Sequence, residues 1–455
     1  MNRKKFFSIV LMLLVALDLL AGCGTGNGTG TNDQEDPAAE TPAGIRTTMA
    51  ELPAAYEGSA EDFMYSGGEG TYSSWWQKRR EAIEVLDVYR DGLDAYQENI
   101  LKVMLSGEEN TVFSPLNIYL ALAVLAETTE GETQEEILKA LHAYDEGALK
   151  TITQALWEAN SSDNPALTCL LANSLWLADD RSYNEELLQQ LATDWHVSSF
   201  RGQMGSEELN QALRDWTNAN TKDLLKEAVE GMETKPDTIF DLVSTLYLKA
   251  AWNDPFQEEM TEEELFHGKT NEVMVPMLKK TDLMDYYRGE HFGAVSLGVS
   301  ECGQAFLILP DEGAELQEVI GADSFYALIR EGWEYEDRED YLVNLALPKF
   351  TVTAKSNLKE TMAALGIQKV FDSEQADFSP LTEEKTVLDK AEHAASLIID
   401  EDGITGAAYT EMAAAEGAAI MEPEQIDFIL DRPFAFVITA RDGSILFAGT
   451  VTDLD

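Results

Sequence analysis

The sequence has few cysteines and few cations for a chain of 455 residues. Its 3 cysteines, Cys23, Cys169 and Cys302, form no CxxC pair, so they indicate neither a disulfide framework nor a cysteine-rich zinc site. Lysine and arginine total 32 against 83 aspartates and glutamates, which gives a formal net charge of −51. A field of that sign repels nucleic-acid backbones, and we expect no nucleic-acid partner.

The familiar catalytic motifs are also missing. No GxSxG, HExxH, GxxxxGK[ST] or GxGxxG pattern is present. Residues 356–359 match SxxK and residues 162–164 match SDN, but their order is the reverse of that in penicillin-recognising hydrolases and no KTG follows, so chance explains them better. The five histidines are scattered without ligand spacing, and acidic runs are expected by number alone. We assign no active site, no metal and no cofactor.

What is present is the composition of a globular protein, with 45% hydrophobic and 25% charged residues. Helical spacing of apolar residues predominates in the first half of the chain, and strand-like runs predominate in the second, which predicts an α+β fold rather than a Rossmann or barrel enzyme. The expected helices are 81–105, 117–126, 134–142, 148–159, 185–192, 207–229 and 356–365. The expected strands are 168–177, 239–249, 294–309, 341–353, 396–400 and 426–452.

The N-terminus reads as an export signal, with three cations at Arg3–Lys5 before a short apolar run at 6–17. The sequence Leu20–Cys23 then resembles the lipobox of bacterial lipoproteins, which implies that residues 1–22 are removed and that Cys23 carries a lipid. The alternative is a plain secretory peptide with an incidental cysteine. After cleavage 29 cations remain against 82 anions, so the mature chain keeps its acidic character.

Residues 24–70 are rich in Gly, Thr, Asn, Pro and Glu, and we expect a flexible acidic linker over 23–75 ahead of a folded domain at 76–455. A lipid would then be the only membrane contact, on the extracellular face of the bacterial cell envelope. A shed or secreted form is the alternative. The neighbouring Trp75 and Trp76 fit either a packed N-terminal extension or a contact patch.

Short blocks occur in a defined order further along the chain: NTVFSPLNI at 110–118, GETQEEI at 131–137, ANSLW at 172–176, TLYLKAAW at 245–252, LPKF at 347–350, LGI at 365–367, ADFS at 376–379 and DRPFAF at 431–436. Together they resemble the serpins, a family of protease inhibitors. The resemblance covers about residues 85–455. It implies a serpin fold with three β-sheets, eight or nine helices and an exposed reactive-centre loop.

The resemblance also implies a mechanism that needs no catalytic residue of the chain itself. A serine protease attacks the loop as a substrate, and the cut loop inserts as a new strand of the large sheet before the acyl-enzyme can hydrolyse. We therefore expect a monomeric inhibitor and not an enzyme. The runner-up is a non-inhibitory serpin-fold binding or scaffold protein, and a hydrolase is a distant third.

Motif matching places the family's shutter, the region that lets the sheet open, on Ser114, Asn117, Ser244 and His393. The family usually has Ser where this chain has Asn117, and Asn where it has Ser244. Exchanging an amide and a hydroxyl preserves the hydrogen-bond inventory around a buried histidine, which we interpret as a compensated swap. The alternative is that these are unrelated surface polar residues.

The hinge of the loop matches at Glu401, Gly403, Ile404, Thr405, Gly406, Ala407 and Ala408, with Ile404 replacing the usual Thr or Ser and Thr405 replacing Glu. As a strand, the loop would present one uncharged face: Ile404, Gly406, Ala408, Thr410, Met412 and Ala414. No proline before Pro423 blocks the ladder hydrogen bonds. An exposed alanine-rich helix or a loose linker is the alternative.

The reactive bond is expected at Gly417–Ala418 by counting forward along the family's hinge. Counting back from Pro433 allows 418–422, so the alternatives are Ala418, Ala419, Ile420 and Met421. All of these are small or aliphatic, which favours elastase-like or subtilisin-like proteases. A trypsin-type pocket requires Arg or Lys, and the first after the hinge is Arg432, outside the loop.

Overall fold

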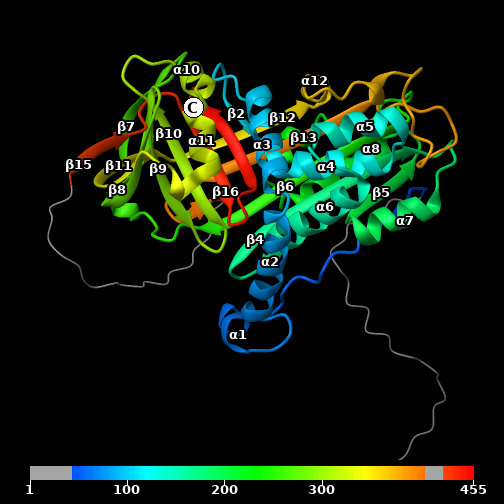
Figure 1. The fold of residues 1–455 in the computed structure, drawn as a ribbon, viewed down its shortest axis with the longest axis horizontal. Coiled ribbons are helices and arrows are strands. Elements are labelled where there is room, and N and C mark those ends of the chain that lie inside the picture. Colours follow the sequence, from blue (N-terminus) through cyan, green and yellow to red (C-terminus); the bar gives the residue numbers. More distant parts are fainter. Residues whose placement is uncertain (1–43, 405–423) are drawn as a thin grey trace, which may run out of the picture. The chain divides into compact units, whose positions relative to one another are not determined.

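Two β-sheets organise residues 44–404 and 424–455, the part of the chain that the computed structural model describes (Figure 1). The first, sheet A, has the strand order β1-β5-β4-β6-β14-β13-β12, with β3 paired to β4. Its central strands are nearly continuous apolar runs because both of their faces are covered. The strands of sheet A are β1 (Arg46–Thr48), β3 (Ser162–Asn164), β4 (Leu167–Ala178), β5 (Val197–Gly202), β6 (Phe240–Ala251), β12 (Phe350–Asn357), β13 (Lys390–Ile399) and β14 (Gly403–Ile404).

The second sheet, sheet B, has the order β15-β11-β8-β9-β10-β16-β17-β2, with β7 paired to β8. Strand β8 has 18 residues and pairs with β7 and β11, and its last residues, 286–289, also pair with β9. Because β8 takes part in both, two of the three expected sheets are joined into one. The strands of sheet B are β2 (Thr111–Phe113), β7 (Glu262–His267), β8 (Glu272–Gly289), β9 (Phe292–Val299), β10 (Gly303–Pro310), β11 (Arg338–Pro348), β15 (Gln425–Ile429), β16 (Phe434–Ala440) and β17 (Ile445–Val451).

The helices of the described residues are α1 (Ala60–Tyr65), α2 (Tyr72–Asp87), α3 (Arg90–Met104), α4 (Pro115–Glu127), α5 (Gly131–Ala140), α6 (Glu146–Asn160), α7 (Glu185–Asp194), α8 (Glu207–Asn220), α9 (Lys226–Val229), α10 (Leu316–Gly321), α11 (Asp323–Glu331) and α12 (Lys359–Ala364), with 3₁₀ turns η1 (Glu258–Met260), η2 (Gly332–Glu334) and η3 (Lys369–Phe371). Helices α1, α9, α10 and α12 have six residues or fewer. The longer ones agree in number with the eight or nine expected.

Helices α4 and α8 cover opposite faces of sheet A. Helix α4 begins where the Ser114 hydroxyl accepts the backbone N–H of Asn117, and Pro115 fits its first turn. Every residue of α4 except the last is buried, as expected of a helix that is apolar on all sides. Helix α8 is amphipathic, and its Trp216 packs toward Phe200 and Val243 on the other face.

Residues 44–75 belong to the folded unit, although a flexible linker was expected over 23–75. Strand β1 extends sheet A by pairing antiparallel with β5, and the backbone N–H of Tyr56 donates to the Asp163 carbonyl at 3.0 Å. Phe63 of α1 is fully buried against the rings of Tyr56 and Trp75. The linker interpretation is wrong for this stretch because its aromatic side chains and strand edge supply the burial and hydrogen bonds that order a chain.

The two tryptophans of α2 pack against the body of the protein. Glu301, in the turn between β9 and β10, accepts hydrogen bonds from the Trp76 indole at 3.0 Å and the Tyr72 hydroxyl at 2.9 Å. The buried Arg79 donates to the backbone carbonyl of Glu301 at 3.0 Å, and its guanidinium lies 4.6 Å from the Trp75 ring centre. The structure therefore favours the packed extension over the contact patch.

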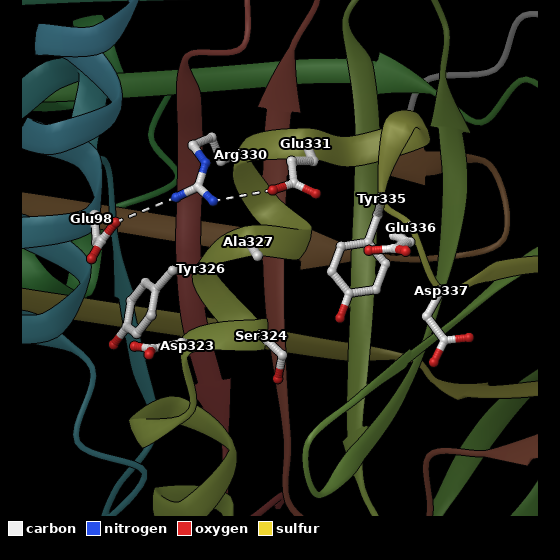
Figure 2. A pocket seen from close by; sticks show the side chains of 10 residues that line it. All are labelled: Glu98, Asp323, Ser324, Tyr326, Ala327, Arg330, Glu331, Tyr335, Glu336 and Asp337. Carbon is white, nitrogen blue, oxygen red and sulfur yellow. Dashed lines mark hydrogen bonds and ion pairs between the residues drawn. The ribbon is translucent and has the colours of Figure 1, made fainter.

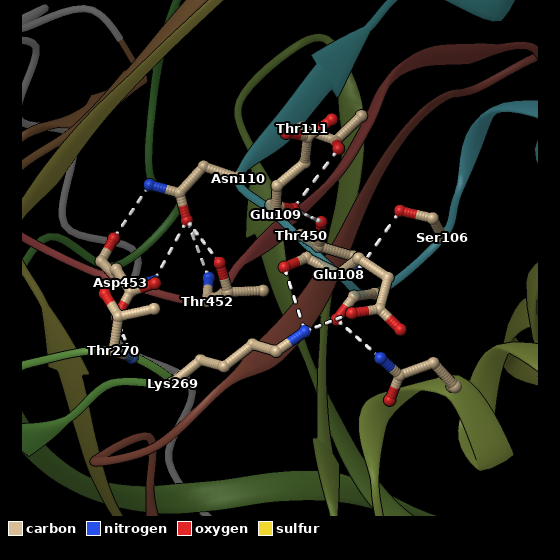
Figure 3. Close-up of polar contacts among 12 residues, drawn as sticks. Ser106, Glu108, Glu109, Asn110, Thr111, Lys269, Thr270, Thr450, Thr452 and Asp453 are labelled. Atoms are coloured by element: carbon tan, nitrogen blue, oxygen red, sulfur yellow. Dashed lines mark hydrogen bonds and ion pairs between the residues drawn. The ribbon is translucent and has the colours of Figure 1, made fainter.

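A polar cluster fastens the C-terminal end to sheet B (Figure 3). The Asn110 side-chain oxygen accepts the backbone N–H of Thr452 at 2.7 Å and that of Asp453 at 3.1 Å, while its amide donates to the Asp453 carbonyl at 2.8 Å. Lys269, between β7 and β8, donates to the Glu108 carbonyl at 3.1 Å and pairs with the Glu108 carboxylate. These contacts join three segments that are distant in sequence.

Candidate functional site

The candidate site lies between two parallel strands of sheet A, β6 and β13. The two strands pair directly only where residues 241–245 face residues 390–394. At the other end β14 lies between them, and Ile404 faces Ala250 on β6 and Ile399 on β13. Direct pairing of β6 with β13 therefore closes sheet A at one end. At the other end the hinge residues of β14 lie between the two strands.

A tight turn carries the chain from β13 back into β14. The Asp400 backbone N–H donates to the Gly403 carbonyl at 3.1 Å, and the Asp400 carboxylate accepts the N–H groups of Asp402 and Gly403, each at 3.1 Å. A Cβ atom at position 403 would lie 2.3 Å from the carbonyl oxygen of Ala250. Only glycine fits this close approach between strands.

Three contacts hold the start of the hinge. Lys349 pairs with the Glu401 carboxylate at 2.7 Å, the Thr261 hydroxyl donates to it at 3.0 Å, and the Trp252 indole donates to the Asp400 carbonyl at 2.9 Å. Partial burial opposes the ionisation of Glu401, but the bonds from Lys349 and Thr261 outweigh it and lower the pKa of Glu401. Lys349 belongs to the block at 347–350 and Trp252 to the block at 245–252. No pattern in the sequence predicts that both side chains contact the start of the hinge.

Ile404 is the last residue described before the loop, and its side chain is fully buried. It faces Ala250, which lies six positions beyond Ser244 on β6, so both of those side chains are on the α4 face of the sheet. The other predicted hinge residues and the candidate reactive bonds lie outside the described residues: Thr405, Gly406, Ala407, Ala408, Gly417, Ala418, Ala419, Ile420 and Met421.

The structure brings the four predicted shutter residues together in the core, each 1% exposed or less. The backbone N–H of Ser114 donates to His393 Nε2 at 3.0 Å. The Ser244 hydroxyl donates to the backbone carbonyl of Asn117 at 3.3 Å. The N-terminus of α4 therefore contacts both strands that must separate if the sheet is to open, and the four are not surface polar residues.

The shutter is neutral and incompletely hydrogen-bonded among the described residues. Burial lowers the pKa of His393 to about 4, so the ring is uncharged, and its bond at Nε2 assigns the proton to Nδ1. That Nδ1 and both amide atoms of Asn117 are buried without a partner within the described chain. The swap of amide and hydroxyl does not produce a bond between these side chains, because the short Ser244 hydroxyl reaches the Asn117 backbone instead.

A charged group lies at the closed end of the same ladder, on the face opposite the shutter. Glu392 is buried and pairs with Lys390 at 2.8 Å and with Lys355 at 3.2 Å. Asp241, which faces Lys390 across the ladder, is 2% exposed, and burial raises its pKa to about 7. No pattern in the sequence indicates this group, because its burial depends on how β6 and β13 pair.

A surface hollow of about 850 Å³ lies elsewhere, beside α11 (Figure 2). Carboxylates predominate in its lining, and Arg330 pairs with Glu98 at 3.7 Å and with Glu331 at 3.1 Å. The hollow shares no residue with the hinge or the shutter. We do not assign it to the candidate site.

The near misses of the motif search do not form a hydrolase site. Residues 162–164 form β3, which pairs with β4, while Ser356 lies in β12 at an edge of sheet A. Over residues 44–404 and 424–455, no three His, Cys, Asp or Glu side chains are grouped so as to hold a metal ion. None of the helices in these ranges has the length and apolar character needed to cross a membrane.

Comparison with known families and proteins identifies the fold. Residues 92–454 match the family model described as serpin, serine protease inhibitor. The pig protein named alpha-1-antitrypsin is 31% identical over 365 residues, which cover 76% of this chain and 82% of the pig protein. The chain belongs to the serpin family. This is a family of protease inhibitors rather than enzymes.

Solved serpin structures share the architecture. An Arabidopsis serpin in its native stressed conformation superimposes with a TM-score of 0.71 at 22% identity, covering 80% of this chain and 98% of that one. Human thyroxine-binding globulin, in complex with its hormone, has a TM-score of 0.65 at 25% identity and covers 79% and 99%. The predicted serpin fold is confirmed.

Proposed function

We propose that this serpin inhibits serine proteases as a suicide substrate, by inserting the segment that follows Gly403 between β6 and β13. The observation that carries the proposal is the position of β14. Gly403 and Ile404 pair antiparallel with β6, and Ile404 also pairs antiparallel with β13. Strand β14 therefore occupies the start of the gap that an inserting strand would fill.

The registers of the flanking strands support insertion without sliding. Nine positions separate Lys390 from Ile399 on β13, and nine separate Asp241 from Ala250 on β6. The relative register is thus the same where the strands pair directly and where β14 lies between them. Separating them sideways is enough to admit a further strand, which gains ladder hydrogen bonds on both sides.

The chemistry belongs to the target protease. Its serine attacks the scissile carbonyl, the C–N bond breaks, and the new amino terminus leaves while the loop remains esterified to the enzyme. Insertion then carries the bound protease along sheet A before water can hydrolyse the ester. This serpin supplies a metastable sheet and a loop, which agrees with the absence of catalytic motifs.

We place the reactive bond at Gly417–Ala418, with Ala418, Ala419, Ile420 and Met421 as alternative positions on the amino side. Small or aliphatic residues fit the shallow apolar pockets of elastase-like and subtilisin-like enzymes. Rapid inhibition of these enzymes and none of trypsin is expected, since the loop offers no Arg or Lys.

A denaturing gel tests the proposal. Mixing the serpin with pancreatic elastase or subtilisin should give an SDS-resistant band near the summed mass, and mass spectrometry of the released C-terminal peptide locates the cut. Cleaved serpin without such a band would instead indicate a non-inhibitory binding or scaffold protein. Turnover of a reporter substrate by the serpin alone would indicate a hydrolase.

The cellular location is a second part of the proposal. Removal of residues 1–22 and acylation of Cys23 would anchor the folded unit, as a monomer, to the extracellular face of the bacterial cell envelope. Cys23→Ser should move the protein from the detergent phase to the aqueous phase of a Triton X-114 partition. Equal partitioning of the two proteins would favour a plain secretory signal.

A further inference from the structure

We infer that the exposed face of strands β8, β11 and β15 is a docking surface for the body of a basic target protease, in addition to the loop that the protease cleaves. The inference rests on the proposed function and deepens it, because it concerns how the target is recognised before its serine reacts. This outer platform is defined by Thr281, Leu283, Leu342, Asn344, Asp427 and Ile429.

The strand registers align the side chains of the outer platform in rows. Strands β15, β11 and β8 are neighbours at one edge of sheet B (Figure 1). Leu283 on β8 faces Leu342 on β11. Two positions along, Thr281 faces Asn344, which in turn faces Asp427 on β15. Because residues two apart on a strand share a face, both rows belong to the same side of the sheet.

Apolar side chains of the outer platform are exposed to solvent. Leu283 is 57% exposed, and Ile429, two positions after Asp427, is 38% exposed. On the other face of the same strands, Met284 and Phe428 are buried in the core. No element of the described chain covers Leu283 and Ile429, and exposed apolar side chains gathered on one sheet face are typical of an interaction surface.

A hydrogen-bonded polar row lies between the apolar side chains. The Thr281 hydroxyl donates to Asn344 Oδ1 at 2.8 Å, and Asn344 Nδ2 donates to Asp427 Oδ1 at 2.7 Å. These bonds orient the exposed Asp427 carboxylate, whose second oxygen has no partner within the described residues. That oxygen can accept a hydrogen bond from a cationic side chain of a partner.

A pair of aspartates lies in the next row, beyond Leu283. Asp285 on β8 and Asp340 on β11 face each other directly, and Arg338 pairs with Asp285 at 3.3 Å. Burial, and to a smaller extent Asp340, raise the pKa of Asp285, while Arg338 lowers it. Carboxylates that face each other across two strands repel, so a cation brought by a partner is favoured here. The charges of this face therefore complement a basic surface.

The length of chain between the proposed reactive bond and β15 identifies the partner. Seven residues separate Ala418 from Gln425, the first residue of β15, and a fully extended chain of that length spans at most about 25 Å. Leu283 lies two strand spacings from β15, which is about 10 Å. A compact protease of about 230 residues is about 45 Å across. A protease bound at the loop is therefore wide enough to reach the outer platform.

The association rate constant with a basic elastase-like serine protease, from progress curves, tests the apolar part of the surface. Leu283→Ser should lower this constant about fivefold, because an apolar contact is lost before acylation. The moles of serpin consumed per mole of protease should not change, since insertion follows docking. Met274→Ser removes a side chain that is 54% exposed from the same strand, but beside β7, and should keep the wild-type constant.

A charge substitution tests the polar row. Asp427→Asn keeps the oxygen that accepts from Asn344 and removes the negative charge, so it should lower the association rate constant about threefold at low salt. Glu263→Gln removes one exposed charge from β7, outside the outer platform, and should leave the constant near the wild-type value.

The same protease with its catalytic serine replaced by alanine separates docking from acylation. It should bind Leu283→Ser about fivefold more weakly than the wild type, measured by fluorescence polarisation of the labelled protease. Equal affinities and equal association rate constants for the wild type, Leu283→Ser and Asp427→Asn would overturn the inference while the SDS-resistant complex still formed. Failure of the wild type to form that complex would instead reject the proposed function.

Discussion

Ile404 enters sheet A with a fully buried side chain between Ala250 and Ile399. An arginine there would take an unpaired charge into the interior at a cost of several kcal/mol, and insertion would slow relative to deacylation. We therefore predict that Ile404→Arg converts the inhibitor into a substrate, measured as cleaved serpin replacing the complex band on a gel. Thr405→Arg should reduce complex formation far less. If Ile404→Arg still inhibits with the wild-type ratio of serpin to protease, the assignment of the Ile404 side chain to the sheet interior is wrong.

Asp241 gives the native state a pH dependence. Because burial raises its pKa to about 7, above the ordinary value of 3.8, the native state holds the proton more tightly than the unfolded state over that range. Its stabilising contribution is complete below pH 4 and is lost as the pH rises through 7. The neighbouring Lys390 and Lys235 lower the pKa while Glu392 and Asp389 raise it, but burial is the largest effect.

Asp241→Asn should therefore stabilise the native serpin at pH 8, by roughly 1–3 kcal/mol, and by less than half as much at pH 5. Thermal melting at the two pH values measures the difference. Asp282→Asn, which removes an exposed carboxylate on β8, should show no such contrast between pH 5 and pH 8. A gain of equal size at both pH values would contradict the role of the buried charge.

The sequence predicted that Ser114, Asn117, Ser244 and His393 belong to one group, and they do lie together in the core, while their role as a shutter stays a prediction. It could not predict which of their polar atoms lack partners. The buried pair Asp241 and Glu392 also escaped it, since each lies within a run of acidic and apolar residues that is unremarkable in so acidic a chain. Burial of a carboxylate is a property of how strands pair, which a single sequence does not display.

Among the elements, those with strong periodicity or long apolar runs were predicted and those with mixed patterns were not. Strands β4 and β6 and helices α4 and α6 overlap predicted segments almost completely, and α8 lies within one. The hairpin of β7 and β8 was missed because its residues alternate irregularly between buried and exposed and include Pro276. The single strand expected at 341–353 is two strands, β11 and β12, on either side of Lys349.

The N-terminal extension offers a test at the scale of elements. Strand β1 pairs with β5 at one edge of sheet A, while α2 contacts Glu301 beside sheet B. Removing residues 1–58 deletes β1 and the bonds of Glu51 and Tyr56, and should lower the Tm of the native protein by about 2–4 °C. Removing residues 1–43 leaves these contacts in place and should leave the Tm unchanged. Equal melting of the two truncations would mean that the extension adds no stability.

For the whole molecule, the fold followed from the order of short blocks rather than from periodicity. Composition and pattern reached only the α+β class, because no local signal states that β13 lies parallel to β6 after some 140 intervening residues. The comparisons agree with the block order over residues 92–454. What neither supplies is the detailed register in sheet A, on which the hinge at Gly403–Ile404 and the cluster of Ser114, Asn117, Ser244 and His393 depend.

Net charge acts at the scale of the whole molecule. It should affect the rate at which the serpin and a protease associate rather than the stability of their complex. A chain with a formal charge of −51 attracts basic proteases over distances that salt screens, since the Debye length falls from about 30 Å at 0.01 M to about 8 Å at 0.15 M. The association rate constant for a basic elastase-like enzyme, from progress curves, should fall about tenfold over this range. An acidic enzyme of the same specificity should show no such fall, and the stoichiometry should stay constant for both because insertion follows the encounter. Equal salt dependence for the two enzymes would show that steering is not at work.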